Sequence, residues 1–429
     1  MLAAALARQL RRRAGVCSGT SDADTGSAMT DHMPDDVSAA GRDLRAFSDQ
    51  LRPRHAVVRN DRGEWVLLRH ALVTQAARDD VRFSSAVSRH LHVPNGIDGA
   101  RHTAYRDALD GFLAAHALAP FHARFRRVAD ELAAALPTGT GIDAVSAIGV
   151  RFAVRAQCAW LGWPASLEDR LVAWVAENHA AARSGDRDRT RRVADAFDAI
   201  IHSVLEPRRA AARGPGDGGD VTTRLMRTRL DGRRLDDAEI VSVLRNWTGG
   251  DLGSIAQCVG VLLHFLATRP ELQDRLRRGM DDARFDATID EILRIDDPFV
   301  SNRRVATCPV SIGGVDLPAG ARVTLNWTSA NRDEAVFGDP DAFDPQRNAP
   351  HNLVYGTGRH ACPGRLLATL ELRIALQALL AATSSITLDP ALPAARAIAP
   401  VGGWASVAVV LAPRRPPAPH GPATGTDTA

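Results

Sequence analysis

The longest apolar stretch lies in the middle of the chain and constrains the fold more than any other feature. It reads "LDDAEIVSVLRNWTGGDLGSIAQCVGVLLHFLATRP", residues 235–270. Apolar residues recur there at spacings of three and four, which predicts a helix of roughly 30 residues, ~45 Å long at 1.5 Å per residue. A helix this long and this apolar belongs in the centre of a protein. The rest of the chain therefore has to pack around it.

Further helices and a few strands are predicted around this segment. Helical spacing recurs in residues 102–137 and 189–209. Strand signals are found in residues 63–73, 305–327 and 403–413, toward the two ends of the chain. The pattern lacks the regular βαβ alternation of a doubly wound sheet. It predicts a mostly helical α+β fold, with a long central helix and small sheets in the N- and C-terminal parts.

The two ends of the chain differ in composition from its body. Residues 1–38 combine arginines with small residues, as in an organelle transit peptide. We favour the alternatives of an unfolded leader or of an over-extended start, with Met29 or Met33 as the true first residue. Residues 413–429 are Pro-rich and predicted to be unstructured. The only strong break between them, residues 208–220, is predicted to be a surface loop. We therefore expect a single domain over residues 39–412.

Composition and charge argue against several classes of protein. The net charge of +3 over 429 residues gives no sign of nucleic-acid binding. No run approaches the roughly 18 apolar residues of a membrane span. The five cysteines are scattered, and no pair has CxxC spacing. This argues against a disulfide framework or a structural zinc site, and it fits a protein of the reducing cytoplasm.

A glycine-rich segment near the C-terminus, "VYGTGRHACPG", allows two kinds of site. Gly356-x-Gly358-x-x-Ala361 matches the loose form of a dinucleotide-binding loop. That site needs a buried strand before the first glycine, but the preceding residues are polar and typical of turns. Pro363 also stands where the helix of such a loop should be running. The pattern is therefore weak evidence for a nucleotide site.

The alternative is a metal site at Cys362. The glycines at 356 and 358 let the backbone approach a flat ligand closely. After Gly364 the sequence "RLLATLELRIALQALLAA" has helical spacing, which places Cys362 just before a helix N-terminus. The free N–H groups and the dipole of that helix favour a thiolate, and a thiolate can ligate iron. A lone cysteine is more often a small buried apolar residue, so the surrounding letters decide.

Those letters form a longer pattern, Tyr355-Gly356-x-Gly358-x-His360-x-Cys362-x-Gly364 followed by Leu367-Ala368. The pattern resembles the haem-binding loop of the cytochrome P450 family, which usually has Phe at the position of Tyr355. The resemblance implies a P450-like fold and haem b as cofactor. It also implies that the Cys362 thiolate is the fifth iron ligand, with Tyr355 and Gly356 beside the haem.

The resemblance also implies a set of partners for the two haem propionates. His102 and Arg106 are one helical turn apart, so both side chains point the same way, and the family uses such a pair to hold a propionate. Arg304, on a predicted strand, resembles a second partner, although Arg303 beside it leaves the assignment open. His360 would be the remaining one.

A third motif resembles the family's structural Glu-x-x-Arg helix. Glu291 and Arg294 share one helical face and can form an ion pair; alone, such a motif is usually a solvated pair. Arg347, in the run Asp-Pro-Gln-Arg, looks like the arginine that joins this pair inside the protein. The resemblance implies a buried structural network with no direct part in the chemistry.

The central helix carries three glycines within five positions, Gly249, Gly250 and Gly253. A glycine inside a helix costs ~1 kcal/mol relative to alanine, so this cluster suggests an opening in the helix. The family has such an opening where dioxygen binds, which implies that Gly250 lies at the cofactor.

The residues beside this opening depart from the family pattern, in which an acid directly precedes a threonine. Counting back from Pro270, the threonine position falls on Ser254 and the acid position on Gly253. Ser254 can donate a hydrogen bond toward the oxygen site, unless its hydroxyl bonds back to its own helix. Asp251 lies two residues before the acid position. It can deliver protons only if the local winding of the helix turns its side chain toward the oxygen site.

The resemblance implies a haem-thiolate monooxygenase that inserts one oxygen atom of O2 into a small hydrophobic organic substrate. Residues Phe299, Val300 and Trp404 lie where the family lines its pocket, although each could equally belong to the core. No redox module fits in the remaining chain, so electrons would come from a ferredoxin and its reductase. Two alternatives stay open: a peroxide-driven peroxygenase, because the acid–alcohol pair is irregular, and a non-catalytic haem protein.

Overall fold

The computed structural model describes residues 32–34, 43–214, 218–399 and 401–414. Most of the predicted leader and the tail beyond residue 414 lie outside these ranges. Three residues of the leader segment, 32–34, are described. Of these, His32–Met33 form strand β1, which pairs with β2 (Val57–Asn60), and Met33 is buried. The folded part thus includes residues ahead of position 39.

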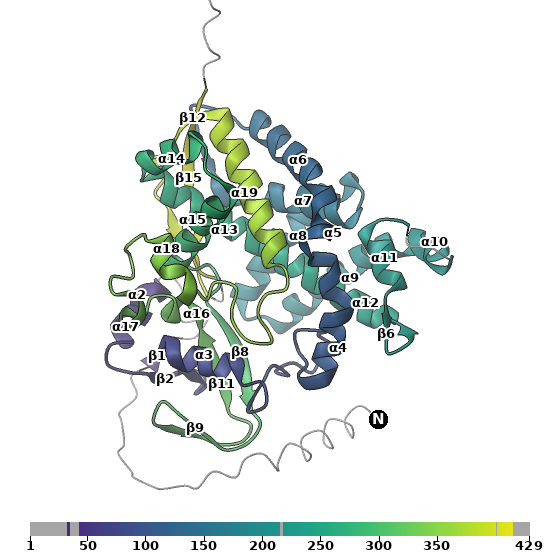
Figure 1. Cartoon of the computed structure of the whole chain (residues 1–429), viewed down its shortest axis with the longest axis vertical. Helices are drawn as coiled ribbons and strands as arrows, with labels where there is room; N and C mark the ends of the chain where they lie inside the picture. The colour runs from purple at the N-terminus through teal and green to yellow at the C-terminus, as the bar shows by residue number, and fades with distance from the viewer. Residues whose placement is uncertain (1–31, 35–42, 215–217, 400, 415–429) are drawn as a thin grey trace, which may run out of the picture.

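The α-helices carry most of the structure (Figure 1). They are α2 Leu44–Leu51, α3 His70–Arg78, α4 Gly99–Leu109, α5 Ala115–Leu118, α6 His122–Ala135, α7 Arg151–Leu161, α8 Glu168–Ser184, α9 Arg187–Leu205, α10 Arg209–Arg213, α11 Val221–Arg227, α12 Asp237–Leu244, α13 Gly250–Ala267, α14 Pro270–Arg277, α15 Asp282–Ile295, α16 Trp327–Ala330, α17 Glu334–Phe337, α18 Pro345–Asn348 and α19 Arg365–Ala382. Two π-helical segments are η3 Ala144–Val150 and η6 Arg245–Gly249. Short 3₁₀ turns are η1 Asp110–Leu113, η2 Ala119–Phe121, η4 Ala165–Leu167, η5 Glu206–Arg208 and η7 Ala349–His351.

The strands are short and form small sheets. Besides β1 and β2 they are β3 Trp65–Leu67, β4 Phe83–Ser84, β5 Gly141–Asp143, β6 Arg229–Leu230, β7 Arg233–Arg234, β8 Ser301–Ala306, β9 Val310–Ile312, β10 Val315–Leu317, β11 Arg322–Asn326, β12 Thr383–Leu388, β13 Ala395–Arg396, β14 Trp404–Ser406 and β15 Ala408–Pro413. The largest sheet has the order β1-β2-β3-β11-β8-β4, and a second has the order β12-β15-β5. The predicted mostly helical α+β class is confirmed.

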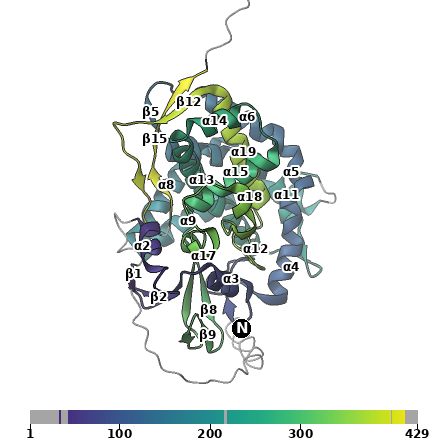
Figure 2. The same ribbon diagram turned by 60° about the vertical axis from the view of Figure 1, so that its left-hand side comes forward.

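The predicted central helix is confirmed as well. Segments α12, η6 and α13 run continuously from Asp237 to Ala267, over 31 residues. Figures 1 and 2 show α13 inside the molecule, with α15 and α19 alongside it. By length and composition alone this helix could cross a membrane, but 67% of its most apolar window is buried inside the protein. It is the core helix that its apolar pattern predicts.

Two local predictions need correction. The strand expected over residues 63–73 ends at Leu67, and helix α3 begins at His70, because Val73, Ala76 and Ala77 are buried at helical spacing. The loop expected over residues 208–220 begins with helix α10, while residues 215–217 lie outside the described part. Strand β5 was not predicted. It has only three residues and is held by pairing with β15, which lies far away in sequence.

The described cysteines only partly follow expectation. Cys158, Cys258 and Cys362 are free thiols. Cys308 is disulfide-bonded, whereas the scattered cysteines argued against a disulfide framework. The argument from cysteine usage for a reducing compartment is weaker for this reason.

Candidate active site

The loop before α19 is shaped by its glycines. Gly356 and Gly358 have φ angles of +67° and +76°, a region that favours glycine. A Cβ on Gly358 would lie 2.7 Å from the carbonyl oxygen of Ala77, so the loop packs directly against the end of α3. The backbone N–H of Cys362 donates to the carbonyl of Tyr355 at 2.8 Å and closes the loop.

Cys362 lies just before the N-terminus of α19, as expected from the sequence. Burial raises the pKa of the Cys362 thiol, and a hydrogen bond from the N–H of Gly364 acts in the opposite direction. The side chain is nevertheless exposed, because the surface that it presents is the wall of a cavity. A metal cation bound to the sulfur would deprotonate it outright.

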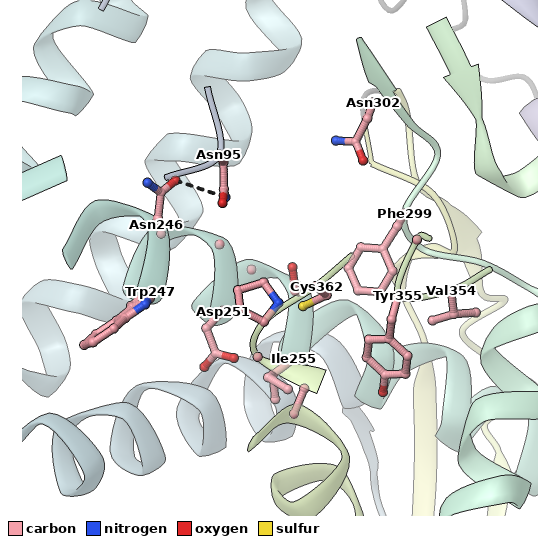
Figure 3. A pocket seen from close by; sticks show the side chains of 18 of the residues that line it. Asn95, Asn246, Trp247, Asp251, Ile255, Phe299, Asn302, Val354, Tyr355 and Cys362 are labelled. Atoms are coloured by element: carbon pink, nitrogen blue, oxygen red, sulfur yellow. Dashed lines mark hydrogen bonds between the residues drawn. The ribbon is translucent and has the colours of Figure 1, made fainter. Parts of the chain in front are cut away.

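The cavity has a volume of about 610 Å³, within the range of cofactor and substrate pockets. Cys362 and Tyr355 line it from the cysteine loop, and Asp251 and Ile255 line it from α13 (Figure 3). Ser254 and Gly250 also line the cavity. The structure therefore brings the predicted metal ligand and the irregular part of the central helix to one site.

The hydroxyl that distinguishes Tyr355 from the usual phenylalanine has a partner. It lies 3.1 Å from Oγ1 of Thr369 on α19. The guanidinium of Arg365 lies 5.1 Å from the centre of the tyrosine ring. The added polar atom is thus accommodated beside the cysteine loop without an unpaired buried group.

Asp251 and Ser254, the two candidates for a role where dioxygen would bind, differ in their hydrogen bonding. The carboxylate of Asp251 accepts from Nε2 of Gln157 on α7 at 2.6 Å, so it turns toward that helix. Burial raises the pKa of Asp251 to about 7. The hydroxyl of Thr248 bonds back to the carbonyl of Leu244, whereas the Ser254 hydroxyl makes no such bond among the described residues. The back-bonded alternative for Ser254 is therefore not observed.

Two of the four propionate candidates carry uncommitted polar groups. Arg304 is 7% exposed, lines the cavity and forms no ion pair with any described residue; one of its amino groups donates to the carbonyl of Arg303. Neither ring nitrogen of the buried His102 has a hydrogen-bond partner. A buried cation without a counter-ion and a buried imidazole without hydrogen-bond partners are costly unless a ligand pairs with them. This donor set fits a cofactor with two carboxylates.

The other two candidates are already paired. Nε of Arg106 donates to Asp110 at 2.7 Å, and one amino group of Arg106 donates to the carbonyl of Ala361, which ties α4 to the cysteine loop. Nε2 of His360 lies 3.1 Å from the carboxylate of Asp98.

The Glu-x-x-Arg motif forms the expected buried pair. Arg294 donates to Glu291 at 2.8 and 2.9 Å, and both side chains are almost fully buried. The prediction that Arg347 joins this pair is wrong, because Arg347 is exposed. The side-chain amide of Asn348 donates to Glu291 at 2.7 Å instead. The short turn of α18 therefore presents the residue after the arginine to the pair.

The loop that precedes α4 is fastened to the central helix. The side-chain amide of Asn246 donates to the carbonyl of Val93 at 2.7 Å, and the N–H of Val93 donates to the hydroxyl of Ser242 at 2.9 Å. The same hydroxyl donates to the carbonyl of Leu91 at 3.2 Å. Asn95 and Asn246 also meet at the cavity (Figure 3).

Two of the three predicted pocket residues line the cavity, and the third does not. Phe299 and Val300 line the cavity. Trp404 does not: its ring stacks on His264 with centroids 3.9 Å apart and lies under the guanidinium of Arg396. Trp404 is therefore a core-packing residue.

Three polar residues near the site were not predicted from the sequence. Gln157 holds Asp251. Glu371 on α19 is buried with neither carboxyl oxygen hydrogen-bonded, and burial together with the charge of Asp251 raises its pKa well above the usual value. His179 on α8 also lines the cavity. The only sequence signal for Glu371 was a charged residue on the apolar face of a predicted helix.

Comparisons with known proteins agree with this geometry. A family model described as cytochrome P450 matches residues 182–384. The chain is 31% identical over 356 residues to the cyclomarin C epoxidase CymV of Salinispora arenicola, which covers 79% of this chain and 88% of that protein. It is 28% identical to the erythromycin C-12 hydroxylase of Saccharopolyspora erythraea, over 79% of this chain and 87% of that one. The structure of open cytochrome P450 EryK from S. erythraea superposes with a TM-score of 0.78 at 26% identity, over 87% of this chain and 97% of that one.

The structure thus places a cysteine loop, just ahead of a helix, across one cavity from the long core helix. The chain belongs to the cytochrome P450 family. It is a monooxygenase of the oxidoreductase class, and its cofactor is haem b.

Proposed function

We propose that the Cys362 thiolate would hold the haem iron and that substrate is oxidised in the cavity between the cysteine loop and α13. The observation that carries this proposal is the free thiol of Cys362 on the wall of that 610 Å³ cavity. When bound, haem b supplies the activation of O2 that places one oxygen atom in the substrate. The chain has to bind the cofactor, position the substrate, exclude water and deliver protons.

Arg304 and His102 are the propionate partners that the proposal favours, because their polar groups have no strong partner in the described chain. Arg106 is already paired with Asp110, and His360 with Asp98. Each could bind a propionate only if it shared or broke that pairing. Tyr355, Gly356 and Gly250 line the same cavity and are proposed to lie against the macrocycle.

On the oxygen side, Ser254 is proposed to donate a hydrogen bond into the cavity. Asp251 is proposed to hold a proton near neutral pH, since its pKa is raised to about 7. Gln157 fixes the orientation of that carboxyl.

The substrate is proposed to be a small organic molecule with an apolar body and a few hydrogen-bonding groups. Phe299 and Val300 give the cavity apolar walls. The side chains of Asn95, Asn246 and Asn302 add amide groups to its lining (Figure 3). The reaction is proposed to be hydroxylation or epoxidation, the activities named for the two curated relatives.

Electrons are proposed to come from a ferredoxin and its reductase in the cytoplasm. Arg365 opens α19 next to the cysteine loop and is exposed, although it pairs with Asp290 at 2.8 Å. An exposed cation at this place suits an acidic electron donor. We further propose that residues 39–412, together with strand β1 and the last residue of β15, form a single P450 domain.

The test begins with a spectrum of the haem-loaded, reduced, CO-bound protein, which should be of the thiolate type. A screen of organic compounds would then be read from the spin-state change of the iron. Turnover of a hit should require ferredoxin, reductase and NAD(P)H. Turnover with hydrogen peroxide alone would favour the peroxygenase alternative, and a lack of turnover with either would favour a non-catalytic haem protein.

A further inference from the structure

An imidazole from a neighbouring helix approaches the central helix where a glycine leaves room. An ideal Cβ on Gly253 would lie only 3.0 Å from Nε2 of His179 on α8. One turn earlier, a Cβ on Gly249 would lie 3.6 Å from Trp174 and 3.7 Å from Phe197. These two glycines therefore let side chains from α8 and α9 pack directly onto the backbone of the central helix.

His179 differs from the other imidazole and carboxylate groups that line the cavity. Asp110 pairs with Arg106, Asp251 accepts from Gln157, and His360 pairs with Asp98. Neither ring nitrogen of His179 has a hydrogen-bond partner in the described part of the chain, although the residue is half-buried. Its polar atoms are therefore free to meet a group inside the cavity.

The protonation state of His179 suits proton transfer. Burial, assisted by the charge of Arg183, lowers the pKa of His179 below its usual value, so the ring is neutral at pH 7. A neutral imidazole has one nitrogen that donates and one that accepts a hydrogen bond. The next residue on α13 after Gly253 is Ser254, whose hydroxyl is also uncommitted. Two proton-handling groups from different helices thus lie beside one position of the cavity wall.

We propose that His179 is a proton donor of this monooxygenase, acting with Ser254 and filling the place where the central helix has glycine instead of an acid. The inference rests on the proposed site at Cys362. Inserting one oxygen atom of O2 into a C–H bond consumes two electrons from the redox partner and two protons, and releases the second oxygen atom as water. The neutral ring of His179 relays a proton: one ring nitrogen takes up a proton from solvent as the N–H of the other gives its proton to the oxygen atom that leaves as water, and exchange with solvent then restores the first tautomer.

A binding measurement tests this without turnover. Cyanide titration of the ferric, haem-loaded protein reports on a nearby group that takes up the proton of HCN and donates to the bound anion. His179→Leu should raise the cyanide Kd about tenfold, the usual worth of one such hydrogen bond. It should also shift the CO stretching frequency of the reduced complex. His202→Leu, at an exposed histidine on α9, is the matched control and should change neither value.

A swap of the two side chains tests the position itself. Gly253→Asp alone should lower the Tm, because its Cβ would collide with His179. The double variant His179→Ala/Gly253→Asp should regain that stability. With hydrogen peroxide and a chromogenic phenol as probes, His179→Ala should lose at least about tenfold in rate, and the double variant should recover most of it.

The outcomes separate the two proposals. If the wild-type protein lacks a thiolate-type reduced-CO spectrum, the Cys362 assignment fails. If that spectrum is present in every variant while the cyanide Kd and the peroxide rate of the His179 variants match those of the wild type, the role of His179 alone is overturned.

Discussion

The imidazole rings of His102 and His360 lie 4.2 Å apart between centroids, although α4 and the cysteine loop are far apart in sequence. His360 is paired with Asp98, whereas His102 has no hydrogen-bond partner. Burial and the neighbouring charge of His360 lower the pKa of His102 to about 4. His102 is therefore a neutral, unsatisfied polar group directly beside a paired one.

Replacing His102 with phenylalanine should separate folding from cofactor binding. Removing a buried polar group that lacks partners should stabilise the haem-free protein by about 1 kcal/mol or more. The same change should speed the loss of haem, because a proposed propionate partner is removed. Thermal melts of the haem-free protein and haem transfer to excess apomyoglobin measure the two effects. Unchanged haem transfer would show that His102 does not hold the cofactor.

Cys362→Ala should abolish the thiolate-type reduced-CO spectrum. Cys258 offers a control, since it is also a free cysteine that lines the same cavity, although it is buried where Cys362 is exposed. Cys258→Ala should keep the spectrum. The assignment is wrong if the Cys362 variant retains the thiolate signature or if the Cys258 variant loses it.

The buried pair of Glu291 and Arg294 should contribute strongly to folding. Glu291→Ala leaves the Arg294 guanidinium buried without its carboxylate, which should cost about 3–5 kcal/mol of unfolding free energy. Arg347→Ala, at the exposed arginine wrongly expected in this network, should stay within about 0.5 kcal/mol of the wild type. Urea denaturation of both variants measures these values, and a large loss in the Arg347 variant would contradict the observed arrangement.

Asp251 should make the protein less stable as pH rises. Its pKa is raised from 3.8 to about 7, so the folded state binds this proton more tightly than the unfolded chain does. The stabilisation is complete below pH 3.8 and is lost as pH rises toward 7. Asp251→Asn should flatten the pH dependence of Tm in this window and give a higher Tm than the wild type at pH 8.

The buried carboxyl of Glu371 contributes in the same direction and keeps part of the slope in that variant. Asp195→Asn, at an exposed acid on α9, serves as the control and should leave the slope unchanged. An unaltered slope in the Asp251 variant would mean that its carboxyl is ionised in the folded protein at neutral pH.

Local sequence patterns predicted those elements of the fold whose structure depends on neighbouring residues in the chain. The apolar period of residues 235–270 predicted the central helix, and the glycines around Cys362 predicted a loop ahead of α19. The end of the strand near Leu67 and the existence of β5 depend on pairing with distant strands, so a single stretch of sequence could not reveal them.

In the candidate site, too, features set by local sequence motifs were predictable, and features set by contacts between distant segments were not. The position of Cys362 ahead of α19 and the pairing of Glu291 with Arg294 were predictable, because each belongs to a motif with fixed spacing. Asn348 took the place expected for Arg347 because the turn of α18 decides which neighbour faces inward. His179 was not predicted, because its place beside Gly253 depends on the packing of α8 onto α13.

The hydrogen bonds that join Val93 to Asn246 and Ser242 bear on how a substrate reaches the cavity beside Cys362. Opening the protein along that edge would break several of them at once, including bonds to the backbone of the chain before α4. Entry and exit of substrate should therefore depend on displacement of α8 and α9, whose stacked Trp174 and Phe197 pack against the backbone at Gly249.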